Sequence, residues 1–214
     1  MNDVKILQQH ESPGGRPQPV CFHNGTLWIG TWDTNKIYSY DPKSWTKTGE
    51  VDAPGRPYGI AAVGDDLRAV IAIGEEEDRF LYRFTPGAGF DESSKTPCPD
   101  FTGSYLASDG TTLYMTQLGK RRIVTIDDNA AIRREIPLPT RCLGVAFGPD
   151  RAFYMIAADE EFENLQLATF DVQLQAPQPQ PVASLNDDAR GLAFDGSAWW
   201  TNYREASQIV AFTL

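Results

Sequence analysis

The chain has 214 residues, of which 41% are hydrophobic and 11% aromatic, so it has the composition and length of a globular protein with a sizeable core. Its formal net charge of −10 disfavours nucleic acid and anionic membranes as partners, because both are negatively charged. The first residues contain no long apolar stretch. The sequence therefore predicts neither a signal peptide nor a membrane helix, and we expect a cytoplasmic protein.

Residues 3–11 read as a single strand without a repeat unit of its own, and an internal repeat follows them. The units start near residues 16, 56, 102, 141 and 188, at intervals of 39 to 47 residues, which is the size of a four-stranded propeller blade. Three units open on similar motifs, which are Arg16-Pro-Gln-Pro-Val, Arg56-Pro-Tyr-Gly-Ile and Arg141-Cys-Leu-Gly-Val.

Each unit continues with a short apolar strand, a tight turn and two further strands. In units one, three and five the second and third strands keep a ten-residue register, seen in the pairs Leu27 and Ile37, Leu113 and Ile123, and Trp199 and Ile209. Units two and four are expected to carry longer acidic loops between these strands, around Glu75 and Asp159.

A fourth strand is predicted at 47–51, 132–136 and 181–185, and it is obscure in unit two. The fifth unit ends at Leu214 after its third strand, so the strand at 3–11 is expected to complete it and close the ring. No segment has helical periodicity. The prediction is an all-β, five-bladed propeller forming one domain over residues 1–214, with its last blade built from three C-terminal strands and one N-terminal strand.

The run from Gly25 to Pro42 and the motif at 56–60 resemble the repeat of virginiamycin B lyase, NHL-repeat and gluconolactonase (senescence-marker) propellers. The resemblance touches all five units and implies the fold first. Five blades also occur in plant-type glutaminyl cyclases and in some lectins, whose motifs are not found here.

The gluconolactonase resemblance implies calcium or magnesium held by carboxylate and amide oxygens, for which Asp33, Asp159 and Asn202 are the candidates. An Asp beside a strand end is also a common turn residue. The lyase resemblance implies a general-base histidine, and the chain offers only His10 and His23. His23 starts a turn on the opposite face, where a structural role is expected.

The ligand site is expected at the channel mouth, where the loops between second and third strands converge. The candidates for ligand contact are polar and aromatic residues of all five units, namely Arg16, Trp32, Arg56, Tyr58, Tyr105, Gln117, Arg141, Arg190 and Tyr203. The arginines at 16, 56 and 141 share one repeat position. Guanidinium groups suit a carboxylate or phosphate, but an arginine at a repeat position can equally pair with a nearby acid.

Cys21, Cys98 and Cys142 are odd in number and lack CxxC spacing, which argues against a disulfide framework or a zinc site and for buried thiols. We therefore hypothesise a propeller that binds a small anionic or polar molecule at its mouth, with a metal-dependent lactone hydrolase or lyase as its enzymatic form. The alternatives are a non-catalytic interaction scaffold and a lectin-like sugar binder using Trp32, Trp200 and tyrosines. No catalytic residue and no oligomeric state is predicted.

Overall fold

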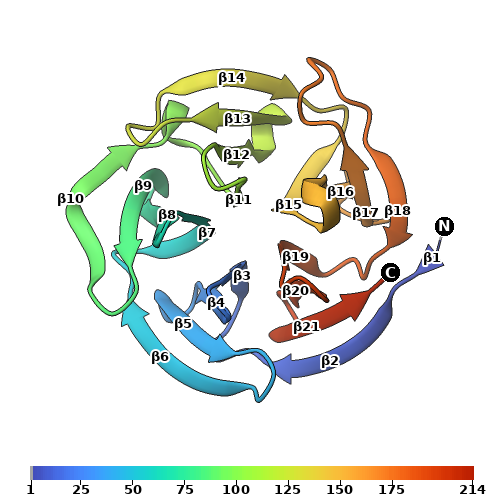
Figure 1. The fold of residues 1–214 in the computed structure, drawn as a ribbon. Coiled ribbons are helices and arrows are strands. Elements are labelled where there is room, and N and C mark those ends of the chain that lie inside the picture. The colour runs from blue at the N-terminus through green and yellow to red at the C-terminus, as the bar shows by residue number, and fades with distance from the viewer. Residues whose placement is uncertain (1) are drawn as a thin grey trace.

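Five antiparallel sheets surround a central axis in the computed structural model, which describes residues 2–214 (Figure 1). The predicted five-bladed propeller is confirmed. Each blade is numbered by its repeat unit. The strands, from the axis outward, are β3 (Pro17–His23), β4 (Thr26–Thr31), β5 (Lys36–Asp41) and β6 (Thr46–Asp52) in blade one; β7 (Arg56–Val63), β8 (Asp66–Ile73), β9 (Asp78–Thr85) and β10 (Gly89–Pro97) in blade two; β11 (Leu106–Ser108), β12 (Leu113–Gln117), β13 (Arg122–Ile126) and β14 (Ile132–Pro137) in blade three; β15 (Arg141–Phe147), β16 (Phe153–Ala158), β17 (Gln166–Phe170) and β18 (Gln180–Ser184) in blade four; and β19 (Ala189–Phe194), β20 (Trp199–Tyr203), β21 (Gln208–Thr213) and β2 (Lys5–Glu11) in blade five.

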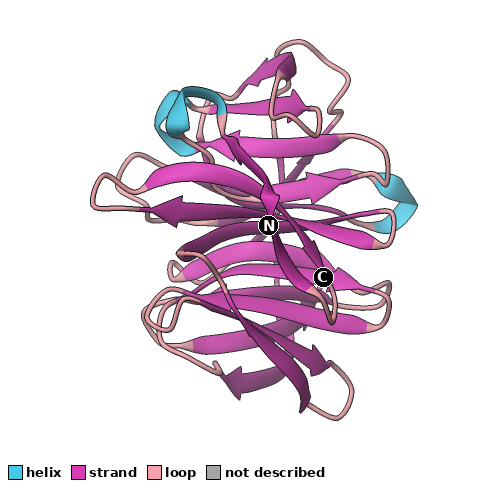
Figure 2. Ribbon diagram, turned by 90° about the vertical axis from the view of Figure 1, so that its left-hand side faces the viewer, coloured by secondary structure: helices cyan, strands magenta, loops and turns pink. Residues whose placement is uncertain are grey.

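Helical structure in the described residues is limited to three single turns, η1 (Pro99–Phe101), η2 (Leu118–Lys120) and η3 (Pro149–Arg151). No helix among residues 2–214 is long and apolar enough to cross a membrane. Figure 2 shows that the turns and connecting loops lie at the two faces of the ring, with the strands between them.

The N-terminal segment closes the ring as predicted, and it does so at two places. β2 pairs with β21, with Lys5 opposite Thr213 and Glu11 opposite Gln208. The short strand β1 (Asn2–Asp3) instead pairs in parallel with β18 of blade four, a contact that the sequence did not indicate. Both chain ends therefore lie side by side at the junction of blades four and five (Figures 1 and 2).

The first strand of each blade lines the axis and is almost wholly buried, as its apolar sequence predicts. The pairing register shifts within β3, β7, β15 and β19, so each of these strands carries a bulge near its start. Glycine is required where neighbouring first strands meet. A Cβ on Gly59 would lie 2.1 Å from the carbonyl oxygen of Ser104 in the next blade.

The axis is blocked midway by apolar side chains at one repeat position, which are Val20, Ile60, Leu106, Val145 and Leu192. The space that they line leaves no room for a water molecule. The channel therefore does not run through the ring, and a ligand at one face has no path to the other.

Blade two differs from the prediction. Its second and third strands, β8 and β9, have eight residues each, and only Gly74 to Glu77 separate them. The expected longer loop is wrong for this blade, because β8 stays buried through Ala72 and pairs with β9 as far as Ile73, which extends the hairpin. Blade four does have the longer loop, at residues 159–165. The obscure fourth strand is β10, which is polar and irregular between Asp91 and Thr96.

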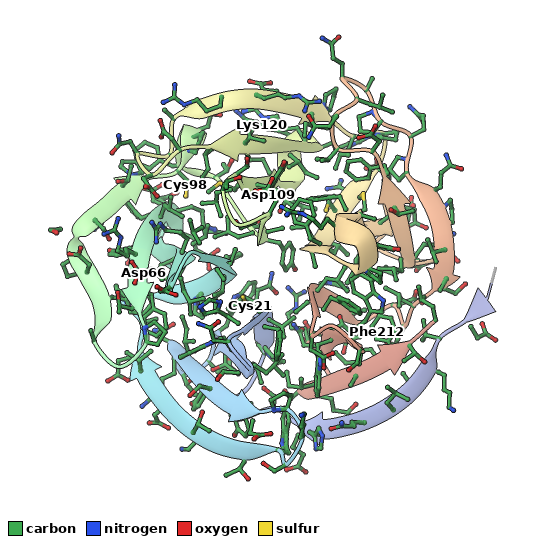
Figure 3. All side chains as sticks on the ribbon, viewed as in Figure 1. Cys21, Asp66, Cys98, Asp109, Lys120 and Phe212 are labelled. Atoms are coloured by element: carbon green, nitrogen blue, oxygen red, sulfur yellow. The ribbon has the colours of Figure 1, made fainter. Side chains whose placement is uncertain are left out.

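The three cysteines are free and buried, as expected from their spacing. Figure 3 places Cys21 close to the axis and Cys98 further out, toward the boundary of blades two and three. Burial raises the pKa of each thiol to about 12, so none is a ready nucleophile.

Candidate functional site

A cavity of about 610 Å³ opens at the face that carries the loops between second and third strands. Its volume is in the range of sites that hold small organic ligands. Two layers of side chains form it, and both follow the repeat, so every blade contributes to each layer.

The lower layer, here called the floor ring, consists of residues two positions before the apolar side chains that block the axis. They are Gln18, Tyr58, Ser104, Leu143 and Arg190. Three of these positions lie within the bulges of the first strands. A bulge changes the direction of a side chain, which is how a strand otherwise buried in the core presents one residue to the cavity.

The upper layer, here called the rim, comes from the loops between second and third strands. It consists of Trp32, Glu76 and Glu77, Leu118 and Gly119, Phe162, and Arg204. Phe101, from η1 between blades two and three, adds a further ring. The cavity thus draws on residues that are far apart in sequence and meet only when the ring closes.

Arg190 is the unusual member of the floor ring, because it is buried and has no ionic partner. Only 9% of its surface is exposed, and its Nη1 donates to the carbonyl oxygens of Asp187 at 3.1 Å and Ala189 at 2.7 Å. Among the described residues no carboxylate lies within ion-pair distance of it. Burial lowers the pKa of Arg190 and Arg204 acts in the same direction, whereas Tyr105 and the carboxylates of Asp188 and Glu205 act to raise it. The remaining guanidinium donors are available to a ligand in the cavity.

Three further polar side chains line the cavity with Arg190. Gln18 Nε2 donates to the Tyr105 hydroxyl at 2.6 Å, and Arg204 Nη1 donates to Gln18 Oε1 at 3.3 Å. Tyr105 accepts in this contact, so its own proton remains free to donate. Burial raises the pKa of Tyr105, which therefore keeps that proton at neutral pH. Arg190 and Tyr105 thus offer donors without a matching acceptor, whereas Arg204 pairs with Glu205 at 3.1 Å.

The wall of blades one and two alternates aromatic and guanidinium groups. Arg16 and Arg204 cover the Trp32 ring at 5.0 Å and 5.1 Å, and Arg79 covers the Tyr58 ring at 3.5 Å. The Trp32 and Tyr58 rings lie 4.7 Å apart, and the indole N–H donates to the carbonyl oxygen of Pro57. This stack fixes Arg204 in place next to the floor ring.

Glu77 organises the acidic side of the cavity. Its carboxylate accepts from Arg56, from the Tyr58 hydroxyl at 2.9 Å and from Arg79 at 3.5 Å. Burial acts to raise the pKa of Glu77, but the hydrogen bonds from Tyr58 and Arg56 outweigh it and the net change is a lowering. Glu77 therefore stays ionised and holds Tyr58 in the floor ring.

Four of the nine predicted ligand contacts line this cavity: Trp32, Tyr58, Tyr105 and Arg190. The repeat-position arginines do not. Arg56 pairs with Glu77, and Arg141 pairs with Glu160 at 3.0 Å and covers the Phe162 ring at 4.7 Å. Both partners are acids of the same blade, in the acidic loops between its second and third strands.

Gln117 and Tyr203 also lie outside the cavity lining. Gln117 is buried and donates to the carbonyl oxygens of Pro99 and Thr102, so it secures the connection from blade two to blade three. Tyr203 packs against the core cluster of blades three to five. Both residues support the loops of the mouth from behind.

The proposed metal ligands have separate local roles. Asp159 accepts from the Glu163 backbone N–H at 2.7 Å and from Asn164 Nδ2 at 3.0 Å, as a turn residue does. Asp33 is exposed, and Asn202 is buried with its Nδ2 on the carbonyl oxygen of Gln18. None of the three lines the cavity.

The donor set does not fit a divalent cation. In the described part of the chain, no group of three or more His, Cys, Asp or Glu side chains is arranged to hold a metal ion. Neither histidine lines the cavity. His23 contacts Asn24 in its turn at 3.0 Å, and His10 stacks on Trp45 at a ring separation of 4.0 Å. The base that the lyase resemblance implies has no counterpart in the cavity.

Several cavity residues were not predicted, among them Ser104, Leu143, Arg79, Phe101 and Phe162. The repeat held a usable signal for Ser104 and Leu143, because each lies two residues after the start of its unit. The residue two positions after each repeat-position arginine reaches the cavity, as Gln18, Tyr58 and Leu143 show. Phe101 and Phe162 lie in segments without a repeat counterpart, so no pattern marked them.

Fold and cavity together define a five-bladed β-propeller with a ligand-sized cavity at one face and a closed axis beneath it. No protein-family model matches the chain, and no curated protein sequence matches it. Similar solved structures do exist. Glutaminyl cyclase from Myxococcus xanthus has a TM-score of 0.73 and 12% identity over 98% of this chain and 95% of that chain.

Two other enzymes share the architecture. A catalytically inactive virginiamycin B lyase from Staphylococcus aureus, solved with quinupristin, has a TM-score of 0.55 and 16% identity over 95% of this chain and 82% of its own. The aldose sugar dehydrogenase from Streptomyces coelicolor, solved with PQQ, has a TM-score of 0.59 and 15% identity over 99% and 81%. At these identities the likeness concerns the fold alone, and it bears out the resemblance to virginiamycin B lyase at that level.

Proposed function

We propose that the chain binds a small molecule bearing an oxyanion group, a carboxylate or a phosphate, in the mouth cavity. The observation that carries this proposal is Arg190, a buried guanidinium on the cavity floor without an ionic partner among the described residues. Burying an unpaired charge is costly, and a bound oxyanion would offset that cost. Bidentate hydrogen bonding suits either anion.

The charges around the cavity favour the same ligand. Three arginines and two glutamates line it, although the whole chain carries a net charge of −10. Glu77 is engaged by Arg56, Tyr58 and Arg79, and Arg204 pairs with Glu205. Arg190 is therefore the lining arginine without an ionic partner among the described residues. The five floor residues all differ, which disfavours a lectin-like arrangement of one similar pocket per blade.

A hydrolase or lyase acting on such a ligand is the enzymatic extension of this proposal. Tyr105, with a free proton, and Glu76, an exposed carboxylate without a partner among the described residues, are the acid–base groups that the cavity offers. A metal-dependent form would need ligands other than Asp33, Asp159 and Asn202, given where these side chains lie.

Thermal unfolding tests the binding proposal. Three proteins are melted with acetate, phosphate or neutral acetamide at constant ionic strength: the wild type, Arg190→Gln and the control Arg133→Gln. The Arg133 side chain lies on the outer strand β14 and is 69% exposed. A ligand at ten times its Kd stabilises by about 1.4 kcal/mol, or about 3–6 °C here. We expect acetate or phosphate to raise the midpoint of wild type and control only. An Arg190→Gln variant that responds like wild type would refute the proposal.

A further inference from the structure

The mouth cavity has two chemically different sides. Gln18, Arg190 and Arg204, the polar and cationic side, come from blades one and five. Leu118, Leu143 and Phe162 come from blades three and four, and Phe101 precedes blade three. Figure 1 shows blade three across the ring from the boundary of blades five and one, with blade four between blades three and five. The apolar side therefore starts next to the cationic side at blade four and reaches the opposite edge of the cavity at blade three.

Phe101 and Phe162 are held at the rim in an uncommon backbone conformation. Their φ angles are +53° and +62°, in the left-handed region that bulky residues rarely adopt. The repeat itself uses a positive φ at the last loop position, occupied by Asn35, Glu77 and Arg121, but neither phenylalanine occupies that position. The same conformation occurs outside the cavity at Trp45, Ala130 and Arg151, so it does not mark a ligand site by itself and shows only that the loop backbone sets the direction of the two rings.

Both rings are supported by their neighbours, and Phe162 is half-buried against the core of blades three to five. Phe101 is 49% exposed and meets Phe80 edge to face at 6.1 Å. Phe162 carries the Arg141 guanidinium over its ring at 4.7 Å, and Glu160 holds that guanidinium from the same loop. Two fixed, accessible aromatic rings at the edge of a polar cavity provide a surface that gains stability when a ligand covers it.

We infer that the ligand is amphipathic: a carboxylate or phosphate joined to an aromatic or alkyl group, with the oxyanion at Arg190 and the apolar group against Leu118, Phe101 and Phe162. This inference rests on the proposed function and adds the second half of the ligand. The opposed sides of the cavity determine the orientation, because each would lose contact if the ligand turned around.

The test compares affinities by calorimetric titration of the whole chain with four probes: acetate, phenylacetate, neutral phenylacetamide and phenyl phosphate. Phenylacetate is expected to bind the wild type at least about tenfold more tightly than acetate, and about tenfold more tightly than phenylacetamide. Whichever of phenylacetate and phenyl phosphate binds more tightly identifies the oxyanion as a carboxylate or a phosphate. Tighter binding of either one than of acetate and phenylacetamide supports the inference.

The variant is the double change Phe101→Ala and Phe162→Ala, and the control is Leu174→Ala, a 52% exposed residue on the outside of blade four. The double variant should bind phenylacetate no more tightly than acetate, whereas the control keeps the preference. Phe101→Ala alone changes an exposed side chain and should lose part of the preference even if the double variant does not fold.

The outcomes separate the two proposals. If acetate and phenylacetate bind equally to the wild type and Arg190→Gln abolishes both, the amphipathic ligand is overturned and anion binding stands. If phenylacetamide binds as tightly as phenylacetate, or if no anion binds, the proposed function is overturned and this inference with it. An unchanged preference in the double variant would assign the apolar contact to other residues and overturn the inference.

Discussion

Replacing Glu77 by glutamine should lower the free energy of unfolding, by an amount that follows from the contacts of its carboxylate. The change keeps the size of the side chain and removes its charge. A hydrogen bond to a charged acceptor contributes about 1.5–3 kcal/mol and one to a neutral acceptor about 1 kcal/mol, so the bond from Tyr58 loses about 1 kcal/mol. The pair with Arg56, which is 52% exposed, adds less than about 1 kcal/mol. The sum of about 1–2 kcal/mol corresponds to a midpoint lower by about 2–8 °C.

The loss should also depend on pH in a defined direction. The pKa of Glu77 is lowered in the folded protein from an ordinary value of 4.5, so the unfolded state binds its proton more readily. The stability that the carboxylate contributes is therefore present above pH 4.5 and is lost as the pH falls through the lower, folded pKa. The difference between wild type and Glu77→Gln should be full at pH 7 and shrink as the pH falls below 4.5 through the folded pKa.

Urea unfolding at several pH values measures this difference, and the adjacent residue supplies the control. Glu76 is exposed and forms no ion pair within residues 2–214, so Glu76→Gln should change stability by less than about 0.5 kcal/mol at any pH. Equal effects of the two substitutions, or a Glu77→Gln effect that does not shrink as the pH is lowered from 7 into the acid range below 4.5, would contradict the role assigned to Glu77.

The closing strand, the metal hypothesis and the thiols give three more predictions. Deleting residues 1–11 leaves β21 as an open edge, so it should abolish cooperative melting and cause aggregation. Deleting residues 1–3 removes only the β1 pairing and should have neither effect. Circular dichroism and gel filtration distinguish the two deletions, and a monomeric 12–214 fragment that melts cooperatively would contradict the prediction. Calcium, magnesium or EDTA should leave the melting midpoint unchanged, and a reproducible shift would restore the metal site. Thiol titration at pH 8 should detect less than one reactive cysteine in the folded chain and all three in guanidinium chloride. Rapid reaction of the folded protein would contradict the buried position of the cysteines.

The fold was predictable because blade architecture depends on local patterns that repeat. The ten-residue register from Leu27 to Ile37 reflects a hairpin with a four-residue connection, and the structure has that hairpin at β4 and β5. Pairing of 3–11 with the last strand followed from edge closure alone. The parallel pair of Asp3 with Ser184 did not, because two residues carry no periodicity to read.

The site was predictable only in part, and the arginines show why. Arg16, Arg56 and Arg141 share a repeat position, and that similarity drew attention to them. The structure pairs Arg56 and Arg141 with acids of their own loops, so their repetition reflects a local contact and not a shared ligand. Sequence alone cannot reveal such pairs, because the partner lies about twenty residues away in a loop of variable length.

Arg190 differs from Arg16, Arg56 and Arg141, because it does not occupy their shared repeat position. Its position belongs to the floor ring, which the bulges of β3, β7 and β15 and the register shift of β19 turn toward the cavity. A bulge places a side chain in the cavity without disturbing the apolar layer beneath it, so this position tolerates Gln, Tyr, Ser, Leu and Arg in the five blades. Packing therefore places few demands on the floor ring, and ligand binding can decide its composition. A charged residue that lacks an ionic partner at such a position is best explained by a group that comes from outside the chain.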